Sequence, residues 1–208
     1  MSLPARLLVI TDRNSAAQPL EQVVAAALRG GCRWLSVREK DLDHAERVAL
    51  LGRIITLARP LGATVTVHGD LAAAEAAGAD GVHLPADGAP AEARARLGKK
   101  ALIGLSVHSA AEAANAGPAA DYVTLSPIFA SAGKPGYGPA LGPAGLAAAV
   151  AGARVPIVAL GGIGADNLAA CLAAGAAAVA VVGAVMAAAD PQAATAALLR
   201  SLASPRAT

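Results

Sequence analysis

The stretch that decides the fold is Pro156-Ile157-Val158-Ala159-Leu160-Gly161-Gly162-Ile163-Gly164, an apolar run that turns directly into a glycine cluster. The run is typical of a strand that is buried on both faces of a parallel sheet. An open doubly wound sheet would place a G-x-G-x-x-G turn after its first strand, and no such motif follows the first predicted strand here. A glycine-rich turn after the seventh strand is where small (β/α)8 barrels bind phosphate. The stretch therefore favours a barrel over the doubly wound alternative.

The same alternation of short apolar runs and longer Ala/Leu segments extends along the whole chain. The pattern predicts eight strands, at Leu7–Thr11, Trp34–Arg38, Thr64–Val67, Gly81–Leu84, Leu102–Val107, Tyr122–Leu125, Pro156–Ala159 and Ala178–Val182. Each is followed by a predicted helix, at Leu20–Gly30, Asp43–Arg59, Leu71–Ala77, Ala91–Leu97, Ala110–Ala116, Gly142–Ala151, Ala165–Ala174 and Pro191–Leu202. These units predict an α/β fold, a single (β/α)8 TIM barrel that forms one domain over residues 1–208.

Composition narrows the possible partners. Hydrophobic residues make up 55% of the 208 residues but aromatic residues only 2%, so aliphatic side chains must fill the core. Few aromatic rings are available for base stacking, and the formal net charge of +2 includes no dense basic run. Nucleic-acid binding is therefore not expected.

The cysteines and the chain start indicate the compartment. Cys32 and Cys171 lack metal-ligand spacing and are expected to be reduced core residues. The first residues lack the apolar segment of a secretion signal, and Gly175 and Gly183 interrupt the most apolar stretch, residues 169–189. We expect a cytoplasmic protein with no membrane partner.

Polar residues gather where the predicted strands end, and in a barrel these ends form the site. Gly161 and Gly162 after strand seven, with Gly183 after strand eight, are predicted to bind phosphate through backbone N–H groups. The helix expected from Ala165 would point its positive end at the same group. The alternative is that these glycines only make tight turns.

A second group of polar residues could hold another anionic group and move a proton. The cations are Arg38, Lys40 and Lys134, each of which could instead form a surface salt bridge. His108 could transfer a proton near neutral pH. The full set of predicted substrate-binding residues is Arg38, Lys40, His68, His83, Ser106, Ser131 and Lys134.

Two features of this rim leave alternatives open. His83 could point into the barrel and bond a neighbour, and a metal site made of His68, His83 and His108 lacks any close-spaced ligand pair, so no metal is predicted. The Gly/Pro-rich segment Ser126–Pro143 is too long for a simple turn, so it is either a lid over the ligand or a surface loop.

Seven motifs in order resemble the thiamine phosphate synthase superfamily, which includes the thiazole tautomerases. They are Val9-Ile10-Thr11-Asp12-Arg13, Val37-Arg38-Glu39-Lys40, Ala79-Asp80-Gly81-Val82-His83-Leu84, Ile103-Gly104-Leu105-Ser106-Val107-His108-Ser109, Ser126-Pro127-Ile128-Phe129, Lys134-Pro135-Gly136 and Val158-Ala159-Leu160-Gly161-Gly162-Ile163. A synthase of this superfamily joins a pyrimidine diphosphate to a thiazole phosphate with Mg²⁺, which aspartates after strands three and four help to hold.

The chain departs from the synthase pattern at those aspartates. Gly69 and Gly88 occupy the ligand positions, with Asp70 and Asp87 one residue away, and Ser36 replaces the usual Gln. The resemblance therefore implies a thiazole tautomerase that aromatises a thiazole carboxylate phosphate, with His108 as the proton shuttle and no cofactor.

Two other functions remain open on the same motifs. One is a divergent Mg²⁺-dependent thiamine phosphate synthase, and the other is a non-catalytic regulatory protein that binds a phosphorylated ligand. In each case the expected partner is a small thiazole phosphate, and a homodimer is possible.

Overall fold

Eight parallel strands close into a barrel in the computed structural model, which describes residues 2–130 and 138–203. The strands are β1 (Leu7–Ile10), β2 (Trp34–Val37), β3 (Thr64–His68), β4 (Gly81–Leu84), β5 (Leu102–Val107), β6 (Tyr122–Leu125), β7 (Ile157–Leu160) and β8 (Ala178–Val181). Each strand pairs with its neighbours in sequence order, and β8 pairs with β1 to close the sheet. The predicted (β/α)8 barrel is confirmed.

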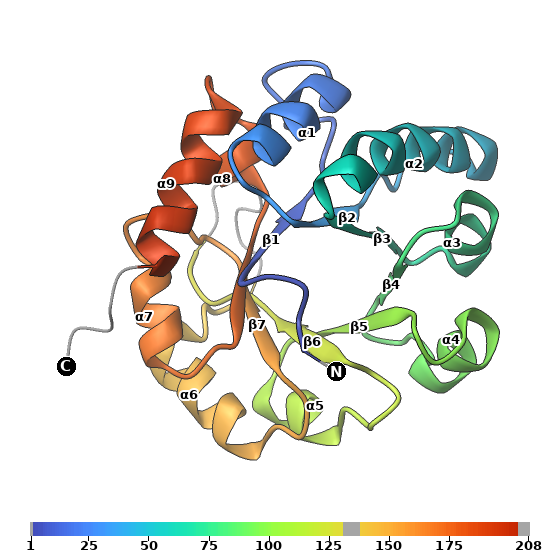
Figure 1. The fold of residues 1–208 in the computed structure, drawn as a ribbon. Helices are drawn as coiled ribbons and strands as arrows, with labels where there is room; N and C mark the ends of the chain where they lie inside the picture. The colour runs from blue at the N-terminus through green and yellow to red at the C-terminus, as the bar shows by residue number, and fades with distance from the viewer. Residues whose placement is uncertain (1, 131–137, 204–208) are drawn as a thin grey trace.

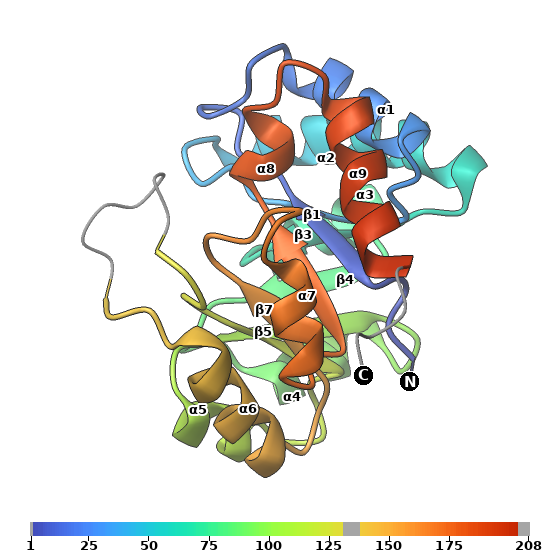
Figure 2. The same cartoon turned by 90° about the vertical axis from the view of Figure 1, so that its left-hand side faces the viewer.

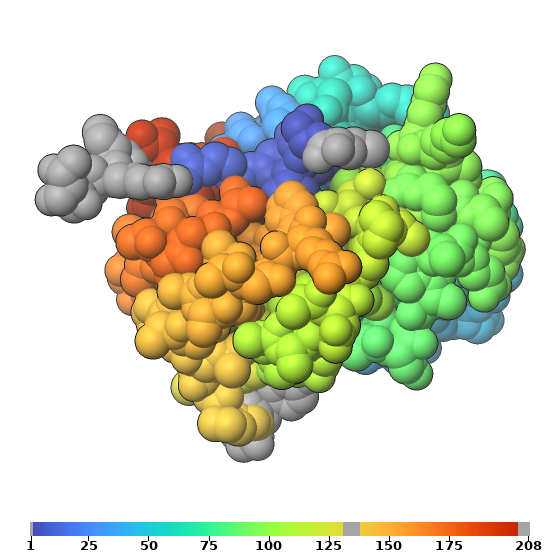
Figure 3. All heavy atoms as spheres, turned by 90° about the horizontal axis from the view of Figure 1, so that it is seen from below, coloured from blue at the N-terminus to red at the C-terminus, as the bar shows by residue number. Residues whose placement is uncertain are grey.

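Helices surround the strands as a ring (Figure 1). They are α1 (Leu20–Arg29), α2 (His44–Ala58), α3 (Leu71–Ala77), α4 (Pro90–Leu97), α5 (Ala110–Asn115), α6 (Gly142–Gly152), α7 (Leu168–Ala173), α8 (Gly183–Met186) and α9 (Pro191–Ala203), with a 3₁₀ turn, η1 (Arg59–Leu61), after α2. Figure 3 views the molecule from below, and the segments coloured green to orange cover most of that face. Among the described residues, no helix is long and apolar enough to cross a membrane.

Alternation along each strand divides the buried residues into two layers. On β2, Leu35 and Val37 belong to the large cluster between the barrel and the helices. Trp34 instead belongs to the smaller cluster inside the barrel, where it meets the ring of Tyr122 edge-on at 4.9 Å. The inside of the barrel is therefore filled by side chains and is not a channel.

Local sequence signals explain where the helices begin on the side of the site. Asp43 forms a capping box with Glu46 at the start of α2, and the side chains of Asp70 and Ser109 accept the third backbone N–H of α3 and α5. Such caps are each worth about 1 kcal/mol. They fix the turns that follow β2, β3 and β5.

The structure corrects the predicted bounds of several elements by one to three residues and adds a short helix. β1 and β2 end at Ile10 and Val37, one residue short of the predicted Thr11 and Arg38, because both later residues turn into the site. The short helix α8 was not predicted. Helix α7 begins at Leu168 instead of Ala165, for a reason that belongs to the site itself.

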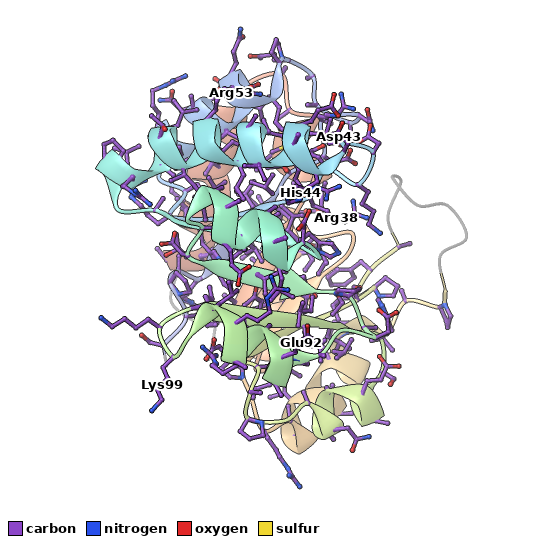
Figure 4. The ribbon with its side chains drawn as sticks, turned by 90° about the vertical axis from the view of Figure 1, so that its right-hand side faces the viewer. Arg38, Asp43, His44, Arg53, Glu92 and Lys99 are labelled. Atoms are coloured by element: carbon purple, nitrogen blue, oxygen red, sulfur yellow. The ribbon has the colours of Figure 1, made fainter. Side chains whose placement is uncertain are left out.

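The carboxyl ends of the strands lie at one end of the barrel. Figure 2 shows α8 at that end, and the start of β1 and the end of α9 at the other. In Figure 4, Arg38 lies toward the same end, and Lys99 lies at the opposite one. The candidate site therefore lies around the loops that follow the strands.

Candidate functional site

The three predicted phosphate-binding glycines line one pocket. Gly161, Gly162 and Gly183 surround a cavity of about 340 Å³ whose lining residues carry no charged side chain. Gly161 and Gly162 have positive φ angles of 102° and 62°. A Cβ on Gly162 would lie 2.3 Å from the carbonyl oxygen of Ala130 and 2.9 Å from the backbone of Phe129. This close approach of two loops requires glycine, and an anion here would be recognised by backbone N–H groups.

Asn167 shapes this pocket and was missed by sequence reasoning. Its side-chain oxygen accepts the N–H of Gly164 at 2.9 Å, and its side-chain nitrogen donates to the carbonyl of Gly162 at 2.8 Å. These bonds hold the residues before Leu168 in a turn, which is why α7 does not start at Ala165. The prediction of a helix that starts at Ala165 and points its positive end at a phosphate is therefore wrong. Only an Asn a few residues after the glycines could have signalled the turn.

The predicted cations Arg38 and Lys40 lie on a loop anchored by a buried carboxyl group. Glu39 is 2% exposed. It accepts hydrogen bonds from the Thr11 hydroxyl at 2.6 Å and from the Arg13 N–H at 2.9 Å, and the Thr11 hydroxyl in turn accepts the N–H of Arg38. Burial raises the pKa of Glu39, although both of these bonds oppose the shift. The arrangement joins the loops after β1 and β2 and fixes the backbone of both cations.

A second cavity, of about 330 Å³, opens beside this loop. Its lining includes Arg38, Lys40, His68 and Gly69. Neither cation makes a side-chain hydrogen bond or ion pair with any residue in the described ranges. This pocket is therefore a candidate site for a second anionic group, after β2 and β3.

Asp70, the carboxylate beside the lost ligand position after β3, is already engaged. It accepts the N–H of Ala73 at 2.8 Å and pairs with Arg47 at 2.6 Å and with His44 at 3.3 Å. Burial favours the neutral acid, but the bonds from Ala73, Arg47 and His44 outweigh it and lower the pKa of Asp70. The side chain is a helix cap and an ion-pair partner.

The two glycines that replace the family's aspartates have backbones that suit glycine. Gly69 has a φ of +72°, and its N–H donates to the carbonyl of His83 at 2.9 Å. A Cβ on Gly88 would lie 2.6 Å from Cβ of Leu84 and 3.0 Å from the carbonyl oxygen of Pro85. Among residues 2–130 and 138–203, no three His, Cys, Asp or Glu side chains form a group that could hold a metal ion.

His83 lies inside the barrel and is part of a polar network. Its Nδ1 is 3.0 Å from the hydroxyl of Tyr122, and its Nε2 is 3.0 Å from Ser106 Oγ and 3.1 Å from Thr124 Oγ1. Gly104 makes room for it, since a Cβ there would lie 2.3 Å from Nδ1 of His83. Tyr122 and Thr124 had no sequence signal, because their strand reads as an ordinary apolar run.

Two further polar groups face the same interior. The His68 ring lies 5.3 Å from the His83 ring, and His68 also lines the cationic pocket. Ser36 Oγ is buried with no hydrogen-bond partner among the described residues. The floor of the mouth can therefore bind a polar heterocycle.

His108 lies at the rim, after β5. Its Nδ1 is 3.0 Å from the carbonyl oxygen of Ser126, and its backbone N–H donates to Glu112 at 2.7 Å. A proton on Nδ1 would satisfy that carbonyl and select one neutral tautomer of the ring. Ser131 and Lys134 lie outside the described residues, as does the rest of 131–137 in the middle of the segment Ser126–Pro143.

The burial of His83 predicts a pH dependence of stability. Burial first, then the neighbouring His68 and Arg38, lowers the pKa of His83 from 6.5 to about 3. As the pH falls below 6.5, the unfolded chain takes up a proton that the folded chain refuses, so stability decreases until the pH approaches 3. Between about pH 7 and pH 5 we expect a loss of about 2 kcal/mol from this residue.

Urea denaturation of the wild type and of His83→Gln at both pH values measures this contribution. The wild type should lose about 2 kcal/mol more than the variant on acidification. Equal losses in the two proteins would mean that His83 titrates normally in the folded state.

The fold and the site define a (β/α)8 barrel whose mouth holds a glycine-lined pocket and a separate cationic pocket. Residues 7–185 match the family model TMP-TENI, described as thiamine monophosphate synthase. The chain belongs to this family, and the resemblance found in the motifs is confirmed.

Individual relatives agree over nearly the full length. The chain is 41% identical to a putative thiamine-phosphate synthase of Geobacter sulfurreducens, covering 94% of this chain and 93% of the relative. It is 39% identical to the thiamine-phosphate synthase of Roseiflexus sp. (strain RS-1), covering 94% and 84%. The structure of thiamine phosphate pyrophosphorylase from Pyrococcus furiosus superposes with a TM-score of 0.84 at 32% identity, covering 95% of each chain.

These relatives overturn one prediction. The loss of two aspartates favoured a thiazole tautomerase, an isomerase, but the curated relatives at about 40% identity are named thiamine-phosphate synthases. The tautomerase prediction is therefore wrong. The prediction failed for a physical reason. The loss of two carboxylates changes how the charge of a diphosphate is balanced, but it does not specify which bond the enzyme makes.

Proposed function

We propose that the chain is a thiamine-phosphate synthase, a transferase that joins a pyrimidine carrying a diphosphate to a thiazole phosphate. The observation that carries the proposal is the presence of two separate pockets at one mouth, of about 340 and 330 Å³. Coupling needs one anion site for each phosphorylated substrate, and the glycine-lined pocket and the cationic pocket supply two. The names of the full-length relatives support the same reaction.

In this proposal each pocket positions one substrate. The backbone N–H groups around Gly161, Gly162 and Gly183 hold the thiazole phosphate, and Arg38 and Lys40 hold the diphosphate. The heterocycles then meet over the polar floor of the barrel. Holding two reactants in register lowers the barrier mainly through orientation. Ser106 and His83 form part of that floor, and His68 lines its edge.

Magnesium is the cofactor that the family implies, and the residues present do not fit a site built from protein carboxylates. Gly69 and Gly88 stand at the ligand positions, and Asp70 is bound to Arg47, His44 and a backbone N–H. Mg²⁺ in phosphate-binding sites usually takes one or two free carboxylates. No step of the proposed reaction is therefore assigned to a protein-held metal.

Substitution of His108 tests the prediction that this residue is catalytic. Coupling the two substrates requires no proton shuttle at a ring carbon, so we expect His108→Ala to reduce kcat by about tenfold or less. A general acid–base residue would contribute on the order of 100-fold to 10,000-fold. Steady-state rates of the variant decide between the two, and a loss beyond about 100-fold would make His108 a catalytic residue.

The direct test of the proposed function is product formation. Purified protein is incubated with both precursors, and thiamine phosphate is followed by mass spectrometry. Turnover that depends on both precursors supports the proposal. Binding of both precursors without any product would contradict it and leave a regulatory protein.

Four earlier expectations stay predictions. They are the single domain over residues 1–208, the homodimer, the cytoplasmic location, and the contribution of Ser131 and Lys134 to substrate binding. Light scattering at assay concentration would test the homodimer, and Lys134→Ala would test the loop cation through the KM of the diphosphate substrate.

A further inference from the structure

The cationic pocket after β2 has an unusual balance of charge. Arg38 and Lys40 face it without an ion-pair partner among the described residues, and Arg47 also lines it. The carboxyl group of Glu39 is buried and bonded to Thr11 and Arg13. Two positive charges are therefore available to a ligand.

Arg47 belongs to the wall of this pocket. Its three side-chain nitrogens bond the carbonyl oxygens of Glu39 and Leu42 and the carboxylate of Asp70. Releasing Asp70 to bind a metal would break the pair with Arg47 and uncap α3, which by itself costs about 1 kcal/mol. Asp70 is therefore a poor replacement for the missing ligand.

The backbone also disfavours a carboxylate at the two family positions. Gly69 has a left-handed φ of 72°, which costs a residue with a side chain about 1 kcal/mol. A side chain at Gly88 would collide with Leu84 and Pro85. An aspartate at either position would therefore be strained or would collide with its neighbours.

Few other carboxylates are available at this rim. The segment Ser126–Pro143 contains no Asp or Glu in its sequence, so it adds no carboxylate from the loop after β6. Asp41 pairs with Arg13 at 2.7 Å. Two candidates remain: Asp87, which is exposed on the loop after β4, and Asp12 on the loop after β1, which accepts the backbone N–H of Asn14 at 3.2 Å.

We propose that this pocket binds a diphosphate group directly through Arg38 and Lys40, without a divalent cation held by protein carboxylates. The inference rests on the proposed function for the identity of the substrate, and it concerns how that substrate is held. A guanidinium can bind two phosphate oxygens at once, and an ammonium supplies a point charge beside it. Glu39, Thr11 and Arg47 act as positioning residues, because they fix the loop that carries both cations.

The experiment is a calorimetric titration with inorganic pyrophosphate, in EDTA and then in excess Mg²⁺. We expect binding in EDTA, with an affinity that rises less than about tenfold when Mg²⁺ is added. Lys40→Ala should weaken binding in EDTA by about tenfold or more, since it removes one of the two charges that would bind the phosphate oxygens. Lys99→Ala, which removes a lysine at the opposite end of the barrel, should change nothing (Figure 4).

A second measurement examines the metal alone. Mn²⁺ added to the free protein should stay in solution by electron paramagnetic resonance, and Asp87→Asn should leave that signal unchanged. The proposal is overturned if pyrophosphate binding needs Mg²⁺, or if Mn²⁺ binds stoichiometrically and Asp12→Asn, Asp70→Asn or Asp87→Asn abolishes the binding. If pyrophosphate binding proves to need a metal, the coupling reaction can still be observed. If the coupling reaction is absent, pyrophosphate binding can still be measured, so the two results are distinguishable.

Discussion

Gly162→Ala is expected to raise the KM for thiazole phosphate by about 100-fold, which is the usual cost of misplacing a bound group by about 1 Å. A Cβ at this position would lie 2.3 Å from the carbonyl oxygen of Ala130, and the φ of +62° adds backbone strain. The collision involves backbone atoms of the segment after β6, so rotation of a side chain cannot relieve it. The loops must separate, and the N–H groups that line the pocket move with them.

Two controls separate this effect from general misfolding. Gly117→Ala has nothing within 4 Å of the new Cβ and should leave KM unchanged. Pyrophosphate affinity of Gly162→Ala reports on the other pocket and should also be unchanged. If a folded Gly162→Ala protein binds thiazole phosphate normally, the glycine-lined pocket is not the phosphate site.

Gly104→Ala is expected to destabilise the protein by roughly 3 kcal/mol or more, since overpacking and a broken buried hydrogen bond both contribute. The new Cβ would lie 2.2 Å from Cζ of Tyr122 and 2.3 Å from Nδ1 of His83. Both of these rings are buried, and they bond each other at 3.0 Å. Neither ring can move without breaking this hydrogen bond or colliding with other side chains inside the barrel.

Urea denaturation measures this effect, and the fluorescence of Trp34 reports the local change because its ring contacts Tyr122 at 4.9 Å. Gly52→Ala, in the middle of α2 with nothing within 4 Å, is the matched control and should stabilise the protein by about 0.5 to 1 kcal/mol. A Gly104→Ala protein as stable as the wild type would refute the described packing of the interior.

The sequence predicted the eight strands well for a physical reason. Each strand is buried on both faces, so its apolar run is continuous, and glycines such as Gly78 mark where helices end before the next strand. The glycines of the lined pocket could be located because their place after β7 and β8 is set by the topology.

Tertiary contacts are what the sequence could not reveal. The start of α7 depends on the side chain of Asn167 bonding Gly162 and Gly164, and no helix propensity encodes that competition. The His83–Tyr122 pair depends on the absence of a side chain at Gly104, and its two partners stand 39 positions apart in the sequence. The role of Asp70 as a cap and partner of Arg47 likewise appears only once β3 and α2 lie side by side.

The reaction itself was predicted wrongly from two positions. Replacement of the metal-binding aspartates seemed to remove coupling, but the second pocket keeps Arg38 and Lys40, and relatives with the synthase name extend over nearly the whole chain. The charge of a leaving diphosphate can be balanced by cations as well as by a metal ion.

A phosphorus NMR time course with both precursors present follows the proposed coupling directly. The diphosphate resonances should convert to free pyrophosphate, one for each thiamine phosphate formed, while the monoester phosphate is retained in the product. Diphosphate that stays intact in the presence of active, folded protein and thiazole phosphate would contradict the proposed coupling.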